Sequence, residues 1–183
     1  MIRLAEIASR HWHSFLMRRV GGSVSNILAV QGNLANTYAR LGRDEEALRM
    51  RRDVYSGRLK VQGEEHEKTL RAAHNYADSL SNLKRYEEAK VLLRKVMPAA
   101  RRILGEGHKL TLMMRMNYAK ALYQDAGATL DDFREAVTTL EDAGRIARRV
   151  LGGAHPTTVG IEASLENARA KLRTRETPSP GSS

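Results

Sequence analysis

The sequence predicts an all-α protein, a solenoid of antiparallel helix pairs, because two landmarks recur at one fixed spacing. The first is a triplet of Asn, a large apolar residue and Ala, repeated every 42 residues at Asn33-Leu34-Ala35, Asn75-Tyr76-Ala77 and Asn117-Tyr118-Ala119. The second begins with Gly and ends with His, at Gly63-Glu64-Glu65-His66, Gly105-Glu106-Gly107-His108 and Gly152-Gly153-Ala154-His155. Apolar residues between these landmarks follow helical spacing. One period that carries two landmarks predicts a repeat array, in which each unit packs against its neighbours.

Composition is normal for a folded protein and excludes cysteine-based chemistry. Of its 183 residues, 42% are hydrophobic, 28% are charged and none is Cys. The lack of Cys excludes a disulfide framework, a thiol nucleophile and a Cys-type zinc site. No apolar stretch approaches the roughly 18 residues that indicate a membrane span. We expect a cytoplasmic protein, or an organellar one if the first residues are a targeting segment.

The formal charge of +10 is spread along the chain. Residues 1–20, 21–62 and 63–104 each carry +3, residues 105–151 carry 0 and residues 152–183 carry +1. A basic surface favours acidic partners of any kind. Because no basic arm concentrates the charge, nucleic acid is the less favoured partner.

Residues 1–20 form an amphipathic pattern with two interpretations. The segment is rich in Arg and poor in acids, as in a mitochondrial transit peptide. The repeat frame favours a degenerate half-repeat helix, because Ala5 and Gly21 lie 42 residues before Ala47 and Gly63. Residues 21–172 then hold three full repeats and a final helix, and residues 173–183 form a disordered polar tail.

The rest of the chain divides into helix pairs separated by turn residues. We expect helices over residues 25–41, 45–61, 67–83, 86–104, 132–151 and 157–173, with a further one starting near Lys109. Asp44 is the predicted N-cap of the second of these, and Pro98 is expected to bend the fourth. Five residues are inserted before Ala136, in a surface loop over residues 126–132 that we expect to end in a carboxylate N-cap, Asp131 or Asp132.

The inward side of each helix is predicted from the apolar spacing. In the first helices of the three units it contains Leu28, Leu34, Ala35, Tyr38, Leu41, Leu70, Ala73, Tyr76, Ala77, Leu80, Leu112, Met116, Tyr118, Ala119 and Leu122. In the second helix of the first unit it contains Ala47, Leu48, Val54, Tyr55 and Leu59.

The period alone fits two classes of helical repeat, since HEAT and armadillo units run about 40–47 residues and tetratricopeptide units about 34. The residue pattern resembles the tetratricopeptide repeat. Small residues that allow close helix crossing lie in each first helix and, after acids, in each second helix, as in Glu45-Glu46-Ala47 and Glu87-Glu88-Ala89. The 42-residue form, closing with Arg102-Ile103-Leu104-Gly105 before His108, resembles the repeats of kinesin light chain. Arg51 departs from that pattern, because such repeats place an apolar or aromatic residue there.

This resemblance implies a right-handed α-solenoid, a tetratricopeptide-like superhelix whose first helices line a concave groove that binds peptides. The Asn of each triplet falls on that wall, where an amide can hold a peptide backbone. The groove residues it implies are Asn33, Asn36, Arg40, Arg71, Asn75, Asp78, Asn82, Asn117, Lys120 and Gln124. Asn36, Asn75 and Lys120 also match part of a clamp for a terminal carboxylate. The alternative is a solvated helix face whose Asn residues make local bonds.

Other candidate sites have structural explanations. His66, His108 and His155 stand one repeat apart, so we expect a ring nitrogen to bond nearby backbone and not to bind a metal. The paired carboxylates at helix starts favour the helix dipole. No phosphate loop or nucleophile elbow occurs, so we expect no enzyme, no catalytic residue and no cofactor.

The predicted function is a protein–protein interaction scaffold that binds an extended, acidic or mixed-charge peptide segment of a partner. The alternative is a structural subunit packed permanently within a larger assembly through its terminal helices. Self-association through those helices is a related possibility, because Trp12 and Phe15 need cover.

Overall fold

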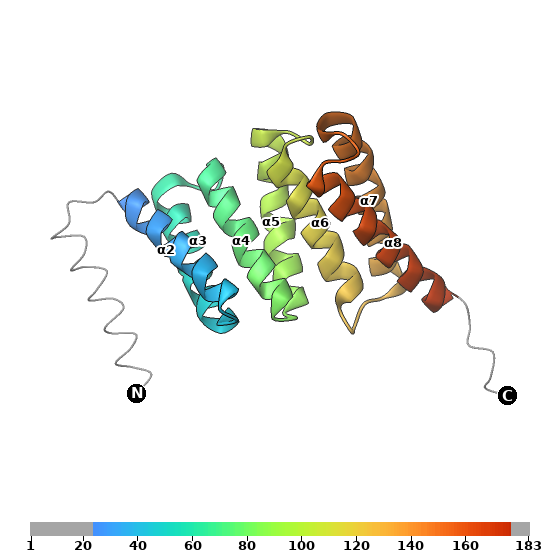
Figure 1. Ribbon diagram of the computed structural model, residues 1–183, viewed down its shortest axis with the longest axis horizontal. Coiled ribbons are helices and arrows are strands. Elements are labelled where there is room, and N and C mark those ends of the chain that lie inside the picture. Colours follow the sequence, from blue (N-terminus) through green and yellow to red (C-terminus); the bar gives the residue numbers. More distant parts are fainter. Residues whose placement is uncertain (1–23, 177–183) are drawn as a thin grey trace.

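The computed structural model describes residues 24–176 and consists there of helices joined by short turns (Figure 1). The predictions for residues 1–20 and 177–183 lie outside the described residues. The helices are α2 (Val24–Arg40), α3 (Asp44–Gln62), α4 (Glu67–Asn82), α5 (Tyr86–Leu104), α6 (Lys109–Gln124), α7 (Leu130–Leu151) and α8 (Pro156–Glu176). We call α2, α4, α6 and α8 the leading helices, and α3, α5 and α7 the second helices. The last helix runs past the predicted end at residue 173.

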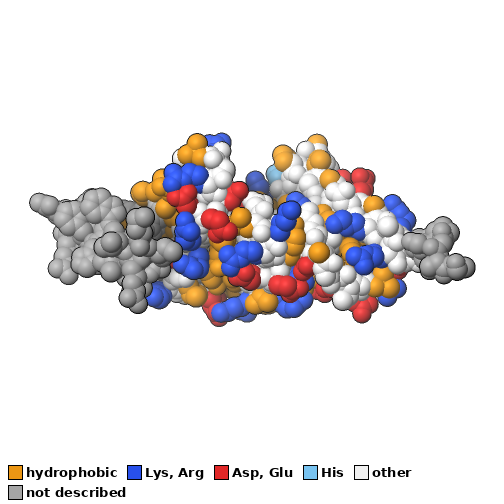
Figure 2. All heavy atoms as spheres, turned by 90° about the horizontal axis from the view of Figure 1, so that it is seen from below, with side chains coloured by type: hydrophobic (Ala, Val, Ile, Leu, Met, Phe, Trp, Pro, Cys, Tyr) orange, Lys and Arg blue, Asp and Glu red, His pale blue; other side chains and the backbone are white. Residues whose placement is uncertain are grey.

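The helices pack in chain order, which confirms the predicted solenoid of antiparallel pairs. Each helix contacts the next along the chain, and α6 also contacts the leading helices α4 and α8. The pairs follow one another along the long axis of the molecule (Figure 1). On the face seen in Figure 2, cations and anions are interspersed along the length of the array.

Small residues lie at the helix crossings, as the repeat pattern predicts. Ala35, Ala77 and Ala119 of the leading helices are 0% exposed. Their counterparts near the start of the second helices, Ala47, Ala89 and Ala136, are buried as well. A methyl side chain at these places lets the two backbones approach closely, so larger residues nearby interdigitate around them.

The Gly of the second landmark ends each second helix for a conformational reason. Gly63 has φ 79° and ψ 173°, and Gly105 and Gly152 adopt nearly the same values. Only glycine enters this region of backbone space without strain. Its N–H still donates to the helix, as from Gly63 to the carbonyl of Leu59 at 3.0 Å.

The recurring histidines are N-caps of the leading helices, as predicted. The Nδ1 atom of His66 accepts a hydrogen bond from the backbone N–H of Lys68 at 3.1 Å. His108 and His155 make the same contact two residues ahead, at 3.3 and 3.1 Å. An N-cap acceptor satisfies one of the free N–H groups of the first turn.

Two predicted caps are wrong. The N-cap of α3 is Arg43, and Asp44 is the first helical residue. Arg43 accepts no helix N–H and instead pairs with Glu46, as Arg85 pairs with Glu88 one repeat later. The inserted loop ends in Thr129, which caps α7 in a reciprocal capping box with Asp132.

The ends of the described array differ in chemistry. Leu34 of α2 and Leu41, the first residue after that helix, are 42% and 67% exposed, which contradicts the prediction that they face inward. At the other end, α8 has the charged side chains Glu166 and Arg169 at the positions of Ala119 and Leu122 in α6, 47 residues earlier. Both are exposed on α8, whereas Ala119 and Leu122 are buried.

Candidate peptide-binding groove

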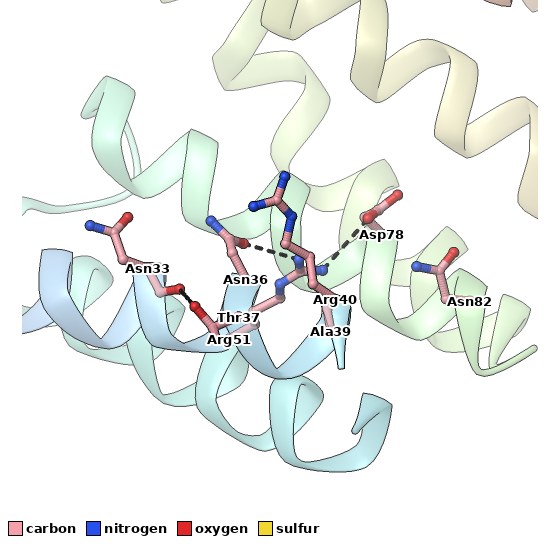
Figure 3. A pocket seen from close by; sticks show the side chains of 8 residues that line it. All are labelled: Asn33, Asn36, Thr37, Ala39, Arg40, Arg51, Asp78 and Asn82. Atoms are coloured by element: carbon pink, nitrogen blue, oxygen red, sulfur yellow. Dashed lines mark hydrogen bonds and ion pairs between the residues drawn. The ribbon is translucent and has the colours of Figure 1, made fainter. Parts of the chain in front are cut away.

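A cavity of about 580 Å³ separates the first two leading helices (Figure 3). Its lining comes from α2, α3 and α4 and consists of Asn33, Asn36, Thr37, Ala39, Arg40, Arg51, Asp78 and Asn82. Asn33 and Asn36 lie on α2, opposite Asp78 and Asn82 on α4 (Figure 3). The cavity is therefore open between two parallel rows of polar side chains.

Arg51 reaches into this cavity from α3, behind both leading helices. Its guanidinium donates to the Ser79 hydroxyl at 2.8 Å, the Asn75 carbonyl at 3.2 Å and the Asn36 Oδ1 at 3.1 Å. It also lies 3.5 Å from the Asp78 carboxylate. The side chain is only 11% exposed, so these contacts replace nearly all of its water.

The position of Arg51 explains why the cavity forms here. Leu93 of α5 and Leu140 of α7 occupy the same register, 42 and 89 residues later, and both are fully buried. A guanidinium in place of an apolar side chain needs polar partners, because burying an unpaired charge is costly. The polar atoms of α2 and α4 supply them, and the cavity lies between those two helices.

Several polar groups in the cavity keep unused bonding capacity. Asn36 accepts from Arg51 through Oδ1, which leaves its NH₂ group to donate. The side chains of Asn33 and Asn82 line the space, and the Arg40 guanidinium extends over it (Figure 3). No ion pair of Arg40 occurs within residues 24–176, so its charge is available there.

His74 is buried on α4 beside this cluster. Desolvation lowers its pKa below the ordinary value of 6.5, with Arg51 and Arg71 adding to the shift and Asp78 opposing it. Within the described chain its Nδ1 atom has no hydrogen-bond partner. The imidazole is therefore neutral at neutral pH, and the charge of the cavity depends on Arg40, Arg51 and Asp78.

The cavity brings together five of the ten residues expected in a groove, and the other five lie elsewhere. The five in the cavity are Asn33, Asn36, Arg40, Asp78 and Asn82. Arg71 pairs with Glu67 on its own helix, and Asn75 contributes its backbone carbonyl to Arg51. Lys120 and Gln124 of α6 are half-buried and exposed. Asn117 is only 6% exposed.

The burial of Asn117 follows from the packing of α6. That helix contacts leading helices on both sides, α4 and α8. Side chains on its inner face are consequently covered from two directions, whereas those of α2 border the cavity. The Asn positions of the three units are equivalent in sequence but differ in access to solvent.

Sequence reasoning missed three lining residues, Thr37, Ala39 and Arg51. For Arg51 the signal was present, since it breaks the apolar pattern of its position in the repeat. A charged residue at a position that is apolar in the other units indicates a local polar cluster. Nothing in the pattern distinguishes Thr37 or Ala39 from other residues of α2.

The other polar networks of the array join helices to one another. The Tyr118 hydroxyl donates to Glu135 at 2.6 Å and accepts from Arg94 at 2.7 Å, which links α5, α6 and α7. Lys90 holds the inserted loop through Asp125 at 3.3 Å. A smaller cavity of about 270 Å³ lies between that loop and α8.

Residues 24–176 contain neither a metal-binding cluster nor a membrane-spanning helix. In that part of the chain, no group of three or more His, Cys, Asp or Glu residues is arranged to hold a metal ion. Every helix there is too short or too polar to traverse a bilayer.

Comparison with protein families matches residues 26–101 to the tetratricopeptide repeat. The matched region contains α3 and α4 with most of α2 and α5, and so includes the whole cavity. Comparison with curated proteins gives no match.

Solved structures share the fold of the chain. Crystal structures of the nearly identical TPR-like repeats of a Podosopora anserina protein, described as a kinesin light chain, align in two forms. The Q17M form has a TM-score of 0.72 at 24% identity, covering 82% of this chain and 68% of the other. The second form has a TM-score of 0.68 at 23% identity, covering 83% and 77%. BtubC (BKLC) from P. vanneervenii aligns with a TM-score of 0.57 at 17% identity, covering 99% and 78%.

Proposed function

We propose that this chain, a tetratricopeptide-repeat protein whose units resemble those of kinesin light chain, binds an extended segment of a partner protein. The binding site is the cavity between α2 and α4. Tetratricopeptide repeats mediate protein–protein interactions, and the proposal assigns that role to a specific site and ligand chemistry.

The two rows of amides support an extended ligand. A peptide in extended conformation exposes its N–H and C=O groups alternately on both sides. The Asn33 and Asn82 side chains can each donate and accept a hydrogen bond, and the Asn36 NH₂ can donate. These groups lie on opposite sides of the cavity, so one strand between α2 and α4 could be held by both rows.

The single observation that carries the charge preference is Arg40. Arg51 is balanced by Asp78 at 3.5 Å, whereas Arg40 has no ion-pair partner among the described residues. The lining therefore has one net positive charge. A carboxylate of the ligand would complete a charge-assisted hydrogen bond with Arg40. The preferred segment is thus acidic, by an Asp or Glu side chain or by a terminal carboxylate.

Fluorescence anisotropy with short labelled peptides tests the proposal. The peptides would have one neutral polar sequence, into which either Asp and Glu or Lys is placed. We expect the acidic peptides to bind, with an affinity that falls as salt is added. Arg40→Ala should weaken that binding roughly tenfold, since a hydrogen bond between charged groups contributes about 1.5–3 kcal/mol.

Lys60→Ala is the matched control, because it removes one exposed cation of α3 outside the cavity. If both variants weaken the acidic peptide equally, binding reflects overall charge and the assigned site is wrong. Equal binding of the acidic and Lys peptides would refute the charge preference.

The exposed apolar side chains of α2 favour a second candidate function, that of a structural subunit held permanently in a larger assembly. Such a subunit should associate when isolated, because its apolar contact surface lacks its neighbour. Sedimentation of the purified chain as a monomer at all concentrations would count against this function.

A further inference from the structure

Among residues 24–176, no helix covers the outer face of α2, whereas the same face of every other leading helix is covered. Val30 is 66% exposed, whereas the residues of the same register in α4, α6 and α8 are buried: Ala72 at 7%, Met114 at 0% and Ile161 at 0%. Thr37 of α2, which also lines the edge of the α2–α4 cavity, is likewise exposed, while its counterparts Ser79, Ala121 and Ala168 are buried. The same face is therefore covered on three leading helices, α4, α6 and α8, and exposed on α2.

The covered examples share one cause. The leading helices α4, α6 and α8 each pack against the second helix that precedes them, which is α3, α5 and α7 respectively. Ile161 of α8, for instance, lies 3.6 Å from the position that a Cβ on Gly144 of α7 would occupy. Within residues 24–176 no helix precedes α2. Its bare face therefore corresponds to the binding site of a second helix.

The opposite end offers no comparable site. At the positions where α6 has the buried Ala119 and Leu122, α8 has the exposed Glu166 and Arg169, and Arg169 pairs with Glu141 of α7 at 2.6 Å. Covering those charges with an apolar helix would be costly. The face of α2 has no acidic residue, and Val30 and Leu34 are aliphatic. An amphipathic helix is therefore accepted at the α2 end alone.

We propose that residues 2–20 of this chain form that helix and dock on the bare face of α2 through Trp12 and Leu16. The segment joins α2 through Gly21, Gly22 and Ser23, much as a short Gly-containing loop joins α3 to α4. In a helix, most of its apolar residues would share one side, namely Leu4, Ala5, Ala8, Trp12, Phe15, Leu16 and Val20, while Ile7 and Met17 fall outside that side.

The repeat register places the large residues of the segment in the contact. With Ala5 at the position of Ala47, Trp12 takes that of Val54 and Val96, which are 7% and 5% exposed. Leu16 takes that of Ala100, which is 0% exposed. Docking would thus bury Trp12 and Leu16 and cover Val30 at once, a gain of apolar burial on both surfaces.

Trp12 makes the proposal directly measurable, because it is the single tryptophan of the 183 residues. In the full-length chain we expect blue-shifted emission and weak quenching by acrylamide. Val30→Asp should shift the emission toward that of free tryptophan and raise the quenching constant several-fold. Leu34→Asp, on the same face, should act in the same way.

Val91→Asp is the matched control, since Val91 is 64% exposed on α5, away from α2. It should leave Trp12 shielded. Because Val30 is exposed in the described array, its substitution should leave the helicity of residues 24–176 unchanged, which far-UV circular dichroism would check. Emission typical of free tryptophan in the unmodified protein would overturn the proposal, as would shielding that Val30→Asp leaves intact.

Dilution separates the proposed occupant from a second copy of the chain. Docking within one chain is independent of concentration, so the shielding should persist on dilution while sedimentation shows a monomer. Shielding that disappears on dilution would mean that the segment binds another molecule, and the proposal would then be wrong. Peptide binding in the α2–α4 cavity is measured separately, so either proposal can fail alone.

Discussion

Replacing Arg51 tests whether this side chain serves the groove more than the stability of the array. Arg51→Ala removes three hydrogen bonds and the packing of the aliphatic stem. Two of the three acceptors are not stranded, because the Asn75 carbonyl lies within a helix and the cavity admits water to Asn36, whereas the buried Ser79 hydroxyl loses its donor. We therefore expect a loss of about 2 kcal/mol in the free energy of unfolding, close to one charged hydrogen bond plus part of the stem.

Arg51→Leu introduces the residue that α5 has at the same register, where Leu93 is fully buried. A buried charged group is often replaced by an apolar one at little cost in stability. We expect the free energy of unfolding to stay within about 1 kcal/mol of the unmodified protein. The same variant should weaken acidic peptides markedly, because the cavity loses a cation and the partner of Asp78.

Urea denaturation followed by far-UV circular dichroism gives the two free energies, and peptide anisotropy gives the affinities. The reasoning is refuted if Arg51→Leu destabilises the protein as much as Arg51→Ala does. That outcome would mean that the polar contacts of Arg51, and not its burial, maintain the packing of α3 against α2 and α4. Unchanged peptide affinity in Arg51→Leu would separately remove Arg51 from the site.

Two further predictions concern pH. Because burial lowers the pKa of His74, the unfolded chain binds a proton more readily than the folded one below pH 6.5. The free energy of unfolding should therefore be unaffected by His74 above that pH and should decline below it. His74→Met introduces the residue found at the same register of the third unit, Met116, and should reduce this decline in urea titrations. For Asp132, hydrogen bonds from Thr129 lower the pKa below 3.8, so its contribution is present above that pH and is lost as the pH falls through the folded-state value. Asp132→Asn should cost about 1 kcal/mol at neutral pH and little in strong acid, and an equal cost at both would show that the charge of the capping box is unimportant.

Most of the fold could be predicted because its determinants recur in the sequence. The landmark Gly and His residues have local causes, a backbone conformation open to glycine and a side-chain cap two residues ahead. Such features depend on a few neighbouring residues and can be recognised in one chain. The helix spanning residues 86–104 matched its prediction at both ends, although Pro98 lies within it.

Errors arose where a prediction depended on a neighbour. Leu34 has the spacing of a core residue, but its exposure depends on whether a helix packs in front of α2. The predicted N-cap of α3 was also wrong. The helix begins at Asp44, one residue earlier than expected, so its N-cap is Arg43, whose side chain pairs with Glu46. Periodicity specifies which side of a helix is apolar, and it does not specify what covers that side.

The candidate site could be predicted only in part, for a related reason. Asn33 and Asn117 are equivalent in the repeat, yet one lines the cavity and the other is buried. The difference comes from α6 having leading helices on both sides. Arg51 makes three hydrogen bonds at the cavity but lies on a second helix. The predicted groove residues all came from leading helices, so Arg51 was not among them.

The charged outer face of α8 also limits how copies of this protein can associate. End-to-end stacking would press Glu166 and Arg169 against the aliphatic side chains of α2 in the next molecule. Such a head-to-tail contact does not close on itself and would propagate into fibres. Removing water from Glu166 and from the Arg169–Glu141 ion pair opposes each such step. These two charged side chains of α8 therefore disfavour a head-to-tail contact with α2 of another molecule.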